Sequence, residues 1–401
     1  MSEHEKSQHT LKEDRVVTFA GVYAGEEEAQ AVERVLKSEW LTAGVEADAF
    51  EREFSDYIGT RFGLVVNSGS SANLLALAAL NLPRGARIIT CACGFPATVN
   101  PIIHLGFEPV FVDIDIATGN ICLEQVERYA PTAQAIIIAH TLGLPVNMER
   151  IIHIATRYNL KVIEDCCEAA GSRYKGKYVG TFGDISTFSF YPSHQMTALG
   201  GGGMVLTDSD AIAMRVKSMR EWGKRQIDPH FEGDYSTELS ESVDNIPYGR
   251  NYIYDTIGYN FKYPEANCAY GREQLKRLTD LNEKRRVNYE YVRSKLIAVN
   301  HKTFELTPDA EPAYFGYGVY FNEPRKRDHV ISYLECKGIR VRPFFAGNIL
   351  RQPAYRHLAD CSNFPNADFL MQNALFFGVW AGLSRDDMNY VVEVFKKAVE
   401  L

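Results

Sequence analysis

The stretch AIIIAHTLGLPVNMERIIHIATRYNLKVIED, residues 135–165, decides the fold class of this 401-residue chain. It begins with the apolar run 135–140 and ends with a second apolar run, 161–165, and a helix-forming segment separates the two. Because two short apolar strands joined by a helical crossover pair in parallel, the stretch predicts a βαβ unit. Strands that are apolar at successive positions are buried on both faces, so we expect helices on both sides of the sheet.

The same alternation continues toward the amino terminus. Further predicted strands are FGLVV (62–66), RIITCA (87–92) and PVFVDI (109–114). Predicted helices cover 25–38 and 47–57, and others begin at about Ser71 and after Phe95. The sequence therefore predicts a large α/β/α domain around a mostly parallel sheet.

A smaller domain is predicted at the carboxyl end. The alternation weakens after about Asp208, and 224–250 is rich in Asp, Glu, Ser and Pro, so we expect a long loop there. A helix from about 266 to 291 would lead into a small α+β domain with strands near 315–321 and 339–343. The predicted division is a polar tail over 1–14, a large domain over 15–265, and a linker helix with the small domain over 266–401.

Composition excludes several classes of protein. The 43 Lys and Arg against 51 Asp and Glu leave a net charge of −8, which gives no reason to expect binding to nucleic acid or to anionic membrane. The sequence contains no apolar run near the ~20 residues of a membrane span, and the first residues lack the apolar core of a signal peptide. We therefore expect a cytoplasmic protein whose eight cysteines are free thiols, and their spacing predicts no metal site.

Ligands of open parallel sheets bind at the carboxyl ends of the strands. Three segments at predicted strand ends carry side chains or backbone groups that could bind a ligand or take part in catalysis. The first is the turn NSGSSAN, 67–73, which leads into a helix. Unpaired N–H groups and the helix dipole would form a phosphate cradle there. Ser70 or Ser71 acting only as a helix cap is an equally good interpretation of the turn alone.

The second segment is EDCCE, 164–168, where Asp165 ends a buried strand. A carboxylate at this place could hold a protonated heterocyclic nitrogen through a charge-assisted hydrogen bond. The alternative role for Asp165 is helix capping.

The third segment is TFSFYPSHQMTAL, 187–199, followed by four glycines, 200–203. It places Ser189 and His194 close to a glycine run, which costs folding entropy and indicates that the backbone approaches something closely.

The order of these segments, with Gly94-Phe95-Pro96, Gly258-Tyr259-Asn260 and Arg342-Pro343, resembles the DegT/DnrJ/EryC1/StrS family of nucleotide-sugar aminotransferases. The resemblance extends from about Thr18 to the carboxyl terminus. It implies the aspartate-aminotransferase type I fold, in which the large domain binds pyridoxal phosphate and two subunits share active sites.

The resemblance also assigns roles to individual residues. It implies that the cofactor phosphate is held by Gly69, Ser70 and Ser189, and that Asn260 reaches the phosphate of the neighbouring subunit. Phe95 would stack on the cofactor ring, and Asp165 would bind the pyridinium nitrogen.

One residue departs from the aminotransferase pattern. Where the family has its Schiff-base lysine, in a motif like SFYPTKNLGALGDGG, this chain reads SFYPSHQMTALGGGG, with His194 at the lysine position and Gly201 at an acidic one. Imidazole cannot form that covalent link, so we expect a noncovalent cofactor, partly as pyridoxamine phosphate. A histidine with an ordinary pKa of about 6.5 is a competent base at neutral pH.

The histidine resembles that of the sugar 3-dehydratases within this family, which remove the hydroxyl on carbon 3 of a nucleotide-linked 4-keto-6-deoxyhexose during dideoxysugar biosynthesis, as for lipopolysaccharide O-antigen. One branch, the GDP-4-keto-6-deoxymannose 3-dehydratases, recharges its cofactor with glutamate. The other, the CDP-4-keto-6-deoxyglucose 3-dehydrases, uses an iron–sulfur cluster and a reductase.

The cluster motif is missing here, because residues 224–235, directly after Arg220-Glu221-Trp222-Gly223, contain no cysteine and Cys167 alone cannot supply about four ligands. The sequence thus predicts a glutamate-driven 3-dehydratase, with Arg342 and Asn348 as candidate contacts for glutamate or the sugar nucleotide. A structural salt bridge is the alternative role of Arg342. An aminotransferase that tolerates histidine, or a noncatalytic binding protein, are the alternative functions.

Overall fold

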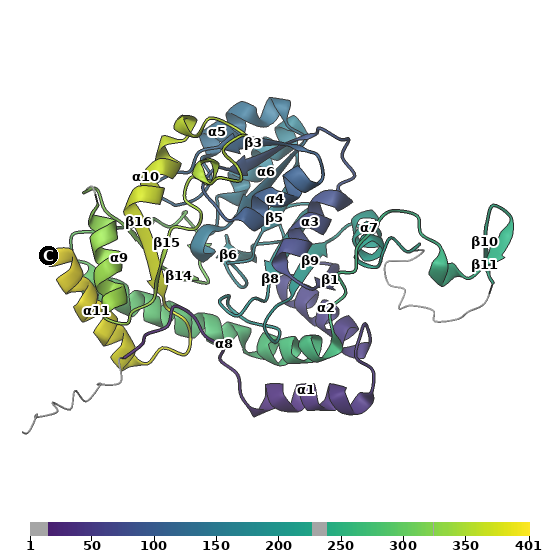
Figure 1. The fold of residues 1–401 in the computed structure, drawn as a ribbon, viewed down its shortest axis with the longest axis horizontal. Coiled ribbons are helices and arrows are strands. Elements are labelled where there is room, and N and C mark those ends of the chain that lie inside the picture. The colour runs from purple at the N-terminus through teal and green to yellow at the C-terminus, as the bar shows by residue number, and fades with distance from the viewer. Residues whose placement is uncertain (1–14, 227–238, 324) are drawn as a thin grey trace, which may run out of the picture.

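A seven-stranded, mostly parallel sheet lies at the centre of the computed structural model, which describes residues 15–226, 239–323 and 325–401 (Figure 1). In spatial order its strands are β1 (Phe62–Val66), β9 (Gly203–Thr207), β8 (Ile185–Ser189), β5 (Lys161–Asp165), β4 (Ala135–Ala139), β2 (Arg87–Cys91) and β3 (Glu108–Val112). β9 is antiparallel to both neighbours, and the other strands run in one direction. The structure confirms the predicted βαβ unit; the polar tail predicted at 1–14 lies outside the described residues.

Helices cover both faces of the sheet because successive side chains of each strand point to opposite sides. The residues that face one side include Leu64, Ile88, Ile137, Ile163 and Val205. Helices packed mainly on that side are α3 (Gly69–Ala79), α4 (Pro96–His104) and α7 (Asp210–Arg220). Helices on the opposite side are α2 (Val45–Ile58), α5 (Leu123–Tyr129), α6 (Met148–Tyr158) and α8 (Glu265–Leu296). This three-layer arrangement matches the predicted α/β/α domain.

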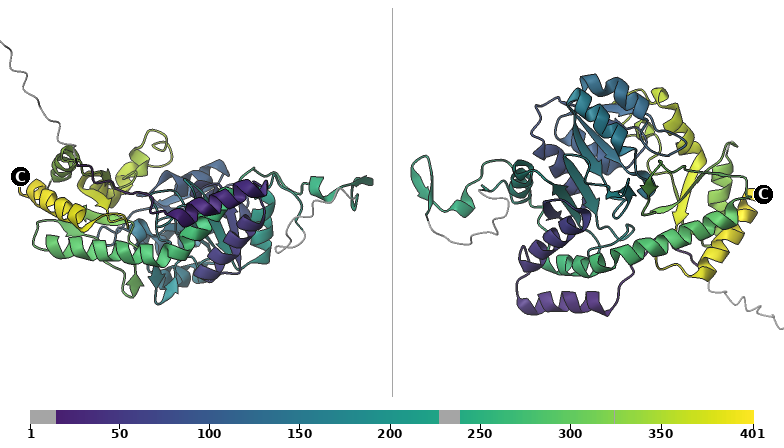
Figure 2. Two further views of the ribbon diagram at one scale, coloured as in Figure 1. Left: turned by 90° about the horizontal axis from the view of Figure 1, so that it is seen from below. Right: turned by 180° about the vertical axis from the view of Figure 1, so that it is seen from behind.

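The long helix α8 connects the central sheet to a second sheet (Figure 2). The second sheet has the order β12 (Lys302–Thr303), β14 (Gly316–Tyr320), β16 (Ala374–Gly378) and β15 (Val341–Pro343), and all its pairs are antiparallel. Its helices are α9 (Lys326–Cys336), α10 (Pro365–Asn373) and α11 (Arg385–Glu400). The predicted linker helix and two predicted strands are therefore present, while the exact domain boundary at 265/266 stays a prediction.

The remaining elements are short or peripheral. Helix α1 (Glu26–Ser38) lies along α8 (Figure 1). A three-stranded sheet joins β13 (Ala310–Glu311) to β6 (Arg173–Tyr174) and β7 (Lys177–Tyr178), and thus ties the carboxyl-terminal part to the large domain. No helix within the described ranges is both long enough and apolar enough to cross a membrane.

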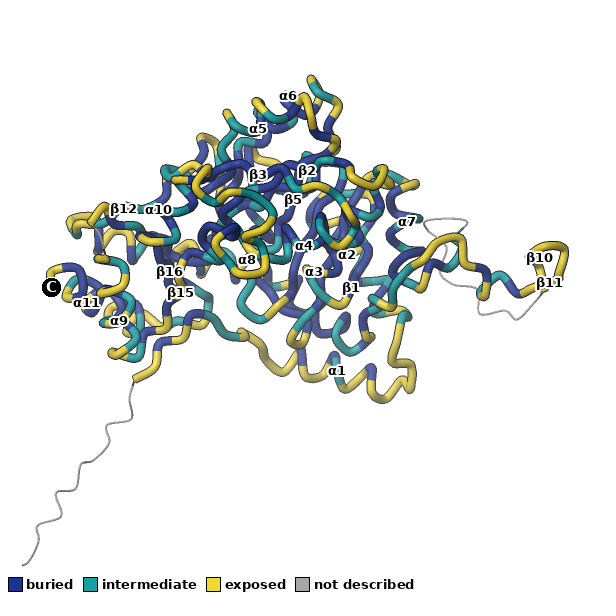
Figure 3. Tube along the Cα trace, turned by 45° about the horizontal axis from the view of Figure 1, so that its top comes forward, coloured by how far each residue is buried: buried dark blue, intermediate teal, exposed yellow. Residues whose placement is uncertain are grey.

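The prediction of a loop throughout 224–250 is wrong for its last part. A hairpin forms there from β10 (Glu241–Val243) and β11 (Ile246–Tyr248), and it projects from the body with an exposed surface (Figure 3). Asp244 and Asn245 connect the strands with φ of 49° and 67°. Two successive residues with positive φ form the turn type that suits a two-residue hairpin, and the composition of the segment does not indicate it. The part of this prediction over 227–238 lies outside the described residues.

The carboxyl ends of β1, β2, β5 and β8 meet at one edge of the central sheet, because these strands run in the same direction. The three chemically rich segments of the sequence follow β1, β5 and β8. The topology therefore brings them to one place.

Candidate active site

The turn after β1 offers free backbone donors at the start of α3. Ser68 is the residue that caps this helix, since its hydroxyl accepts a hydrogen bond from Ser71 N at 3.1 Å. The proposed cap at Ser70 or Ser71 is therefore wrong by two or three positions. The N–H groups of Gly69 and Ser70 lie in the first turn, where a helix supplies no acceptor. Gly69 must be glycine, because a Cβ there would lie 2.8 Å from the Cβ of Ser189.

The glycine run 200–203 lies against the same turn. A Cβ on Gly203 would lie 2.5 Å from the carbonyl oxygen of Ser68, and Gly202 has φ of +98° beside the ring of Tyr263. The close backbone approach that the glycine run predicts is therefore an approach to the turn at 67–73, called the phosphate turn below. It brings the end of β8 next to the start of α3.

Asp165 is held in a fixed orientation at the end of β5. Its Oδ2 accepts hydrogen bonds from Thr98 Oγ1 at 2.7 Å and Asn73 Nδ2 at 2.9 Å. Its Oδ1 accepts one backbone hydrogen bond, from Cys167 N at 3.2 Å, and so keeps acceptor capacity for a further donor. A turn, not a helix, follows Asp165, so the capping role does not apply. Thr98 and Asn73 are site residues that the sequence analysis missed.

Phe95 is an exposed aromatic residue near the turn at 67–73. It precedes α4, and 59% of it is exposed, so its ring is available to stack on a ligand. Phe95 and Ser70 both line a cavity of about 310 Å³. The cavity borders the first turns of α3 and α4, where free N–H groups and an exposed aromatic ring suit a planar, phosphorylated ligand.

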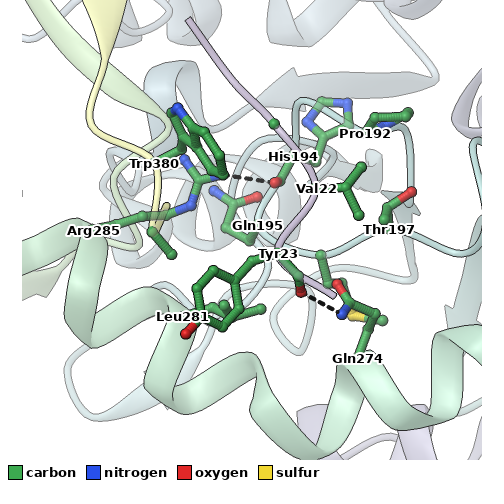
Figure 4. Close-up of a pocket in the computed structure, with 13 residues that line it drawn as sticks. Val22, Tyr23, Pro192, His194, Gln195, Thr197, Gln274, Leu281, Arg285 and Trp380 are labelled. Atoms are coloured by element: carbon green, nitrogen blue, oxygen red, sulfur yellow. Dashed lines mark hydrogen bonds between the residues drawn. The ribbon is translucent and has the colours of Figure 1, made fainter. Parts of the chain in front are cut away.

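His194 lies in the turn after β8 and lines a small cavity with Gln195 and Arg285 (Figure 4). Its imidazole packs against two aromatic rings. Its ring centroid is 5.3 Å from that of Phe315 and 6.5 Å from that of Tyr191. Its Nδ1 is buried and has no hydrogen-bond partner in the described structure. Burial, and secondarily the positive charge of Arg285, lowers the pKa of His194 to about 3. The ordinary value of about 6.5 expected from sequence is therefore wrong.

Glu168 is a second titratable group near this turn that the sequence analysis did not assign. Its Oε2 accepts a hydrogen bond from Leu142 N at 2.9 Å, and desolvation raises the pKa of Glu168 to about 8. Gln195 Nε2 donates to the backbone carbonyls of Glu168 and Ala313, the latter at 2.8 Å. The turn that carries His194 is thus tied to both the large domain and the carboxyl-terminal part. A carboxylic acid that is largely protonated at neutral pH can donate a hydrogen bond to a ligand.

Asn260 lies beside the phosphate turn of its own chain and is exposed. The carbonyl of the next residue, Phe261, accepts a hydrogen bond from Asn67 N at 3.1 Å. The predicted contact of Asn260 with the phosphate of a neighbouring subunit stays a prediction.

Arg342 is exposed on β15 and forms no salt bridge within the described residues. Its guanidinium lies over the ring of Phe19, 5.2 Å from the centroid, and its Nη1 donates to Val341 O at 2.9 Å. The salt-bridge interpretation is therefore wrong here, and the guanidinium has capacity for an anionic ligand.

Asn348 has a structural role instead of the predicted substrate contact. It is fully buried, and its Nδ2 donates to Cys361 O at 3.0 Å and to Asp368 Oδ1 at 2.8 Å. Its Oδ1 accepts from Leu350 N at 3.2 Å. Because both ends of the amide are engaged, a contact with substrate would require this network to break.

One group of metal-ligand side chains occurs in the described part of the chain: His140, Glu164 and Cys166. Glu164 accepts three backbone N–H hydrogen bonds, from Gly180, Phe182 and Gly183. His140 accepts from Val146 N at its Nδ1 and contacts Glu164 at its Nε2. These polar atoms already satisfy one another, so the group is a buried hydrogen-bond network that supports the end of β5.

Comparison with known proteins gives a consistent result. The model of the DegT/DnrJ/EryC1/StrS aminotransferase family matches residues 22–396. The lipopolysaccharide biosynthesis protein RfbH of Salmonella typhimurium is 37% identical over 400 residues, which cover 95% of this chain and 91% of that protein. A dTDP-4-dehydro-2,6-dideoxy-D-glucose 3-dehydratase of Saccharopolyspora spinosa is 35% identical over 372 residues, 88% of this chain and 80% of that protein.

A solved structure shares the architecture. GDP-4-keto-6-deoxymannose-3-dehydratase with a trapped PLP-glutamate geminal diamine superposes with a TM-score of 0.86 at 28% identity, covering 95% of this chain and 100% of that chain. The predicted aminotransferase-type fold, with its large parallel-rich sheet, is confirmed.

Proposed function

The chain belongs to the DegT/DnrJ/EryC1/StrS aminotransferase family, and we propose that it is a 3-dehydratase of a nucleotide-linked 4-keto-6-deoxyhexose that depends on pyridoxamine phosphate. The observation that carries the proposal is His194, which occupies the lysine position of the family motif, in the turn after β8, whose last residue is Ser189. The similarity to a curated 3-dehydratase and to a solved one supports it. Similarity to RfbH is consistent with a product used in lipopolysaccharide.

The residues at the sheet edge fit pyridoxal and pyridoxamine phosphate. The N–H groups of Gly69 and Ser70, with the hydroxyl of Ser189, would hold the phosphate at the start of α3. Phe95 would cover one face of the ring, and the free acceptor capacity of Asp165 Oδ1 would bind the protonated ring nitrogen. Thr98 and Asn73 orient Asp165, so this part of the site is preorganised for the cofactor.

When bound, the cofactor supplies an amine that condenses with the sugar ketone and a ring that accepts electrons. Asp165 keeps the ring nitrogen protonated. His194, neutral at physiological pH, takes a proton from the carbon that bears the amine, and the resulting imidazolium donates a proton to the hydroxyl on carbon 3. The low pKa makes the protonated imidazole a strong acid toward that leaving group, and it makes the neutral imidazole a correspondingly weaker base toward the carbon proton.

Glutamate is the proposed amino donor, and Arg342 is the proposed contact for its carboxylate. Over one cycle the sugar loses the oxygen of carbon 3, while glutamate becomes 2-oxoglutarate and ammonia. Atoms and electrons balance in this reaction without an external reductase.

We also propose that two copies of the chain share their active sites. Phe95, Tyr191 and Leu199 are large apolar residues that are exposed around the site, at 59%, 60% and 45%. The projecting hairpin region exposes Ile246 and Ile257, at 62% and 94%. A second copy would cover such apolar surface and bring Asn260 of one copy to the phosphate of the other.

The function is tested by an absorbance spectrum of the purified protein before and after glutamate, followed by addition of a 4-keto-6-deoxy sugar nucleotide. We expect interconversion of the aldehyde and amine forms of a noncovalent cofactor, with one ammonia and one 2-oxoglutarate for each deoxygenated sugar. An amino sugar formed without ammonia would make the protein an aminotransferase. A colourless protein that consumes neither substrate would point to a binding protein.

The pH dependence of dehydration follows from the lowered pKa of His194. Because the imidazole gains its proton only near pH 3, it stays in the neutral, proton-accepting form at all higher pH values. We therefore expect kcat to lack an acid limb centred at the ordinary histidine value of about 6.5. The measurement is kcat of the holoenzyme from about pH 8 to pH 5, with circular dichroism as a control for folding. A half-maximal kcat at the ordinary histidine value would contradict the prediction.

A further inference from the structure

Arg285 of α8 is a buried cation that has no counter-ion among the described residues. It is 3% exposed, and no Asp or Glu of the described residues lies within salt-bridge distance of it. Its Nη2 donates to the carbonyl of His194 at 2.7 Å, and its Nη1 donates to the carbonyls of Tyr314 and Phe315 at 3.4 and 3.3 Å. Burying a charge is costly in free energy unless the charge is paired, so an unpaired arginine at this buried position indicates a specific role.

The carbonyls that Arg285 binds belong to the two segments that position the His194 side chain. One is the backbone of His194 itself, and another is the backbone of Phe315, whose ring packs against the imidazole at 5.3 Å with an interplanar angle of 36°. In Figure 4 the guanidinium lies between Trp380 and Gln195 and points to the His194 carbonyl. One side chain thus fixes the position of the imidazole relative to the surface on which it rests.

Gln195 joins the same two segments from a second direction, through the carbonyl of Ala313 at 2.8 Å. The His194 turn belongs to the large domain, and residues 313–315 lead into β14 of the second sheet. The orientation of His194 is therefore set by a contact between the two parts of the chain.

We propose, on the basis of the proposed function, that Arg285 is a positioning residue for His194, whose carbonyl it binds together with that of the supporting Phe315. The hydrogen bonds of its guanidinium among the described residues are to backbone carbonyls. It acts by holding the imidazole in one orientation toward the cofactor and substrate.

The unpaired charge of Arg285 adds an electrostatic effect to this role. The titratable residues that line the cavity beside His194 are Tyr23 from the amino-terminal segment and Arg285 from α8, and Tyr191 faces the imidazole from its own turn. No carboxylate of the described residues lines that cavity. After burial, Arg285 is the second cause that lowers the pKa of His194. Removing the charge should raise that pKa, because the imidazolium would no longer be repelled.

The test compares Arg285→Gln, Arg285→Lys and Arg286→Gln in the holoenzyme. Arg286 is the matched control, since it is adjacent, exposed and paired with Glu283. We expect Arg285→Gln to lower kcat by about 10- to 100-fold with little change in KM, because displacing a catalytic group by about 1 Å has effects of that size. Arg285→Lys should lose part of kcat but keep the charge, and Arg286→Gln should leave kcat unchanged.

The readout that separates positioning from mere structural support is the titration of His194 followed by NMR of labelled imidazole, which needs no turnover. We expect a higher pKa in Arg285→Gln and an unchanged one in Arg285→Lys. An unchanged titration in Arg285→Gln, or a kcat equal to the wild type in both variants, would overturn the proposal. If Arg285→Gln does not fold, the proposal is tested by Arg285→Lys alone, and a kcat equal to that of the wild type would overturn it. Failure of the proposed function shows itself differently, as absence of ammonia release from the wild-type protein.

Discussion

Replacing His194 with asparagine is expected to lower kcat for dehydration by about 10²- to 10⁴-fold, the usual contribution of a general acid–base group. Asparagine occupies similar space and can pack on Phe315, but its amide cannot accept and release a proton at neutral pH. The structure motivates this size of effect because the imidazole is held between rings, and its Nδ1 has no competing partner among the described residues. The measurement is single-turnover deoxygenation by the pyridoxamine form.

His153→Asn is the matched control for this substitution. His153 lies on α6 and is exposed. We expect it to keep wild-type kcat. If His194→Asn also retained kcat within about twofold, His194 could not be the group that transfers the proton.

A second large effect is expected for Asp165→Asn, with a loss of about 10²-fold or more in kcat, similar to the loss of one preorganised electrostatic contact in other enzymes. The amide cannot form the charge-assisted hydrogen bond that keeps the ring nitrogen protonated, so the ring would accept electrons less well. The neighbours Thr98 and Asn73 would still orient the side chain. The measurement is kcat together with the absorbance of bound cofactor.

Glu164→Gln is the control for Asp165→Asn because the two acids are adjacent but point to opposite faces of β5. Glu164 accepts hydrogen bonds from Gly180, Phe182 and Gly183, so its substitution should lower the melting temperature. The kcat of the folded protein should change little. Equal kcat for Asp165→Asn and the wild type would refute the role of Asp165 as the partner of the ring nitrogen.

Much of the fold was predictable because it depends on local pattern. The strand at 62–66 and the strand at 161–165 have the bounds that their apolar runs predicted, since turn residues and polar residues end those runs. The hairpin at 241–248 was missed although its turn residues, Asp244 and Asn245, are a local signal. The Asp, Glu, Ser and Pro content of that segment predicts a loop, whereas its two turn residues favour a hairpin.

The candidate site likewise contains residues that local pattern predicts and residues whose role depends on tertiary contacts. Ser70, Phe95, Asp165 and Ser189 follow or end strands that run in one direction, so their approach follows from the topology. Asn348 was predicted as a substrate contact from its place in a motif, but its burial depends on Asp368 and Cys361, which no local pattern connects to it.

By itself the sequence determined the order of strands and helices, the parallel sheet edge and the presence of histidine in place of lysine, because these depend on residue types and on spacing along the chain. Only the tertiary structure decided the pKa of that histidine and its orientation. Both depend on Arg285, 91 residues away in sequence, and on Phe315 in the second part of the chain. Burial and charge act through space, so their effect on His194 is defined only once α8 and β14 have packed against its turn.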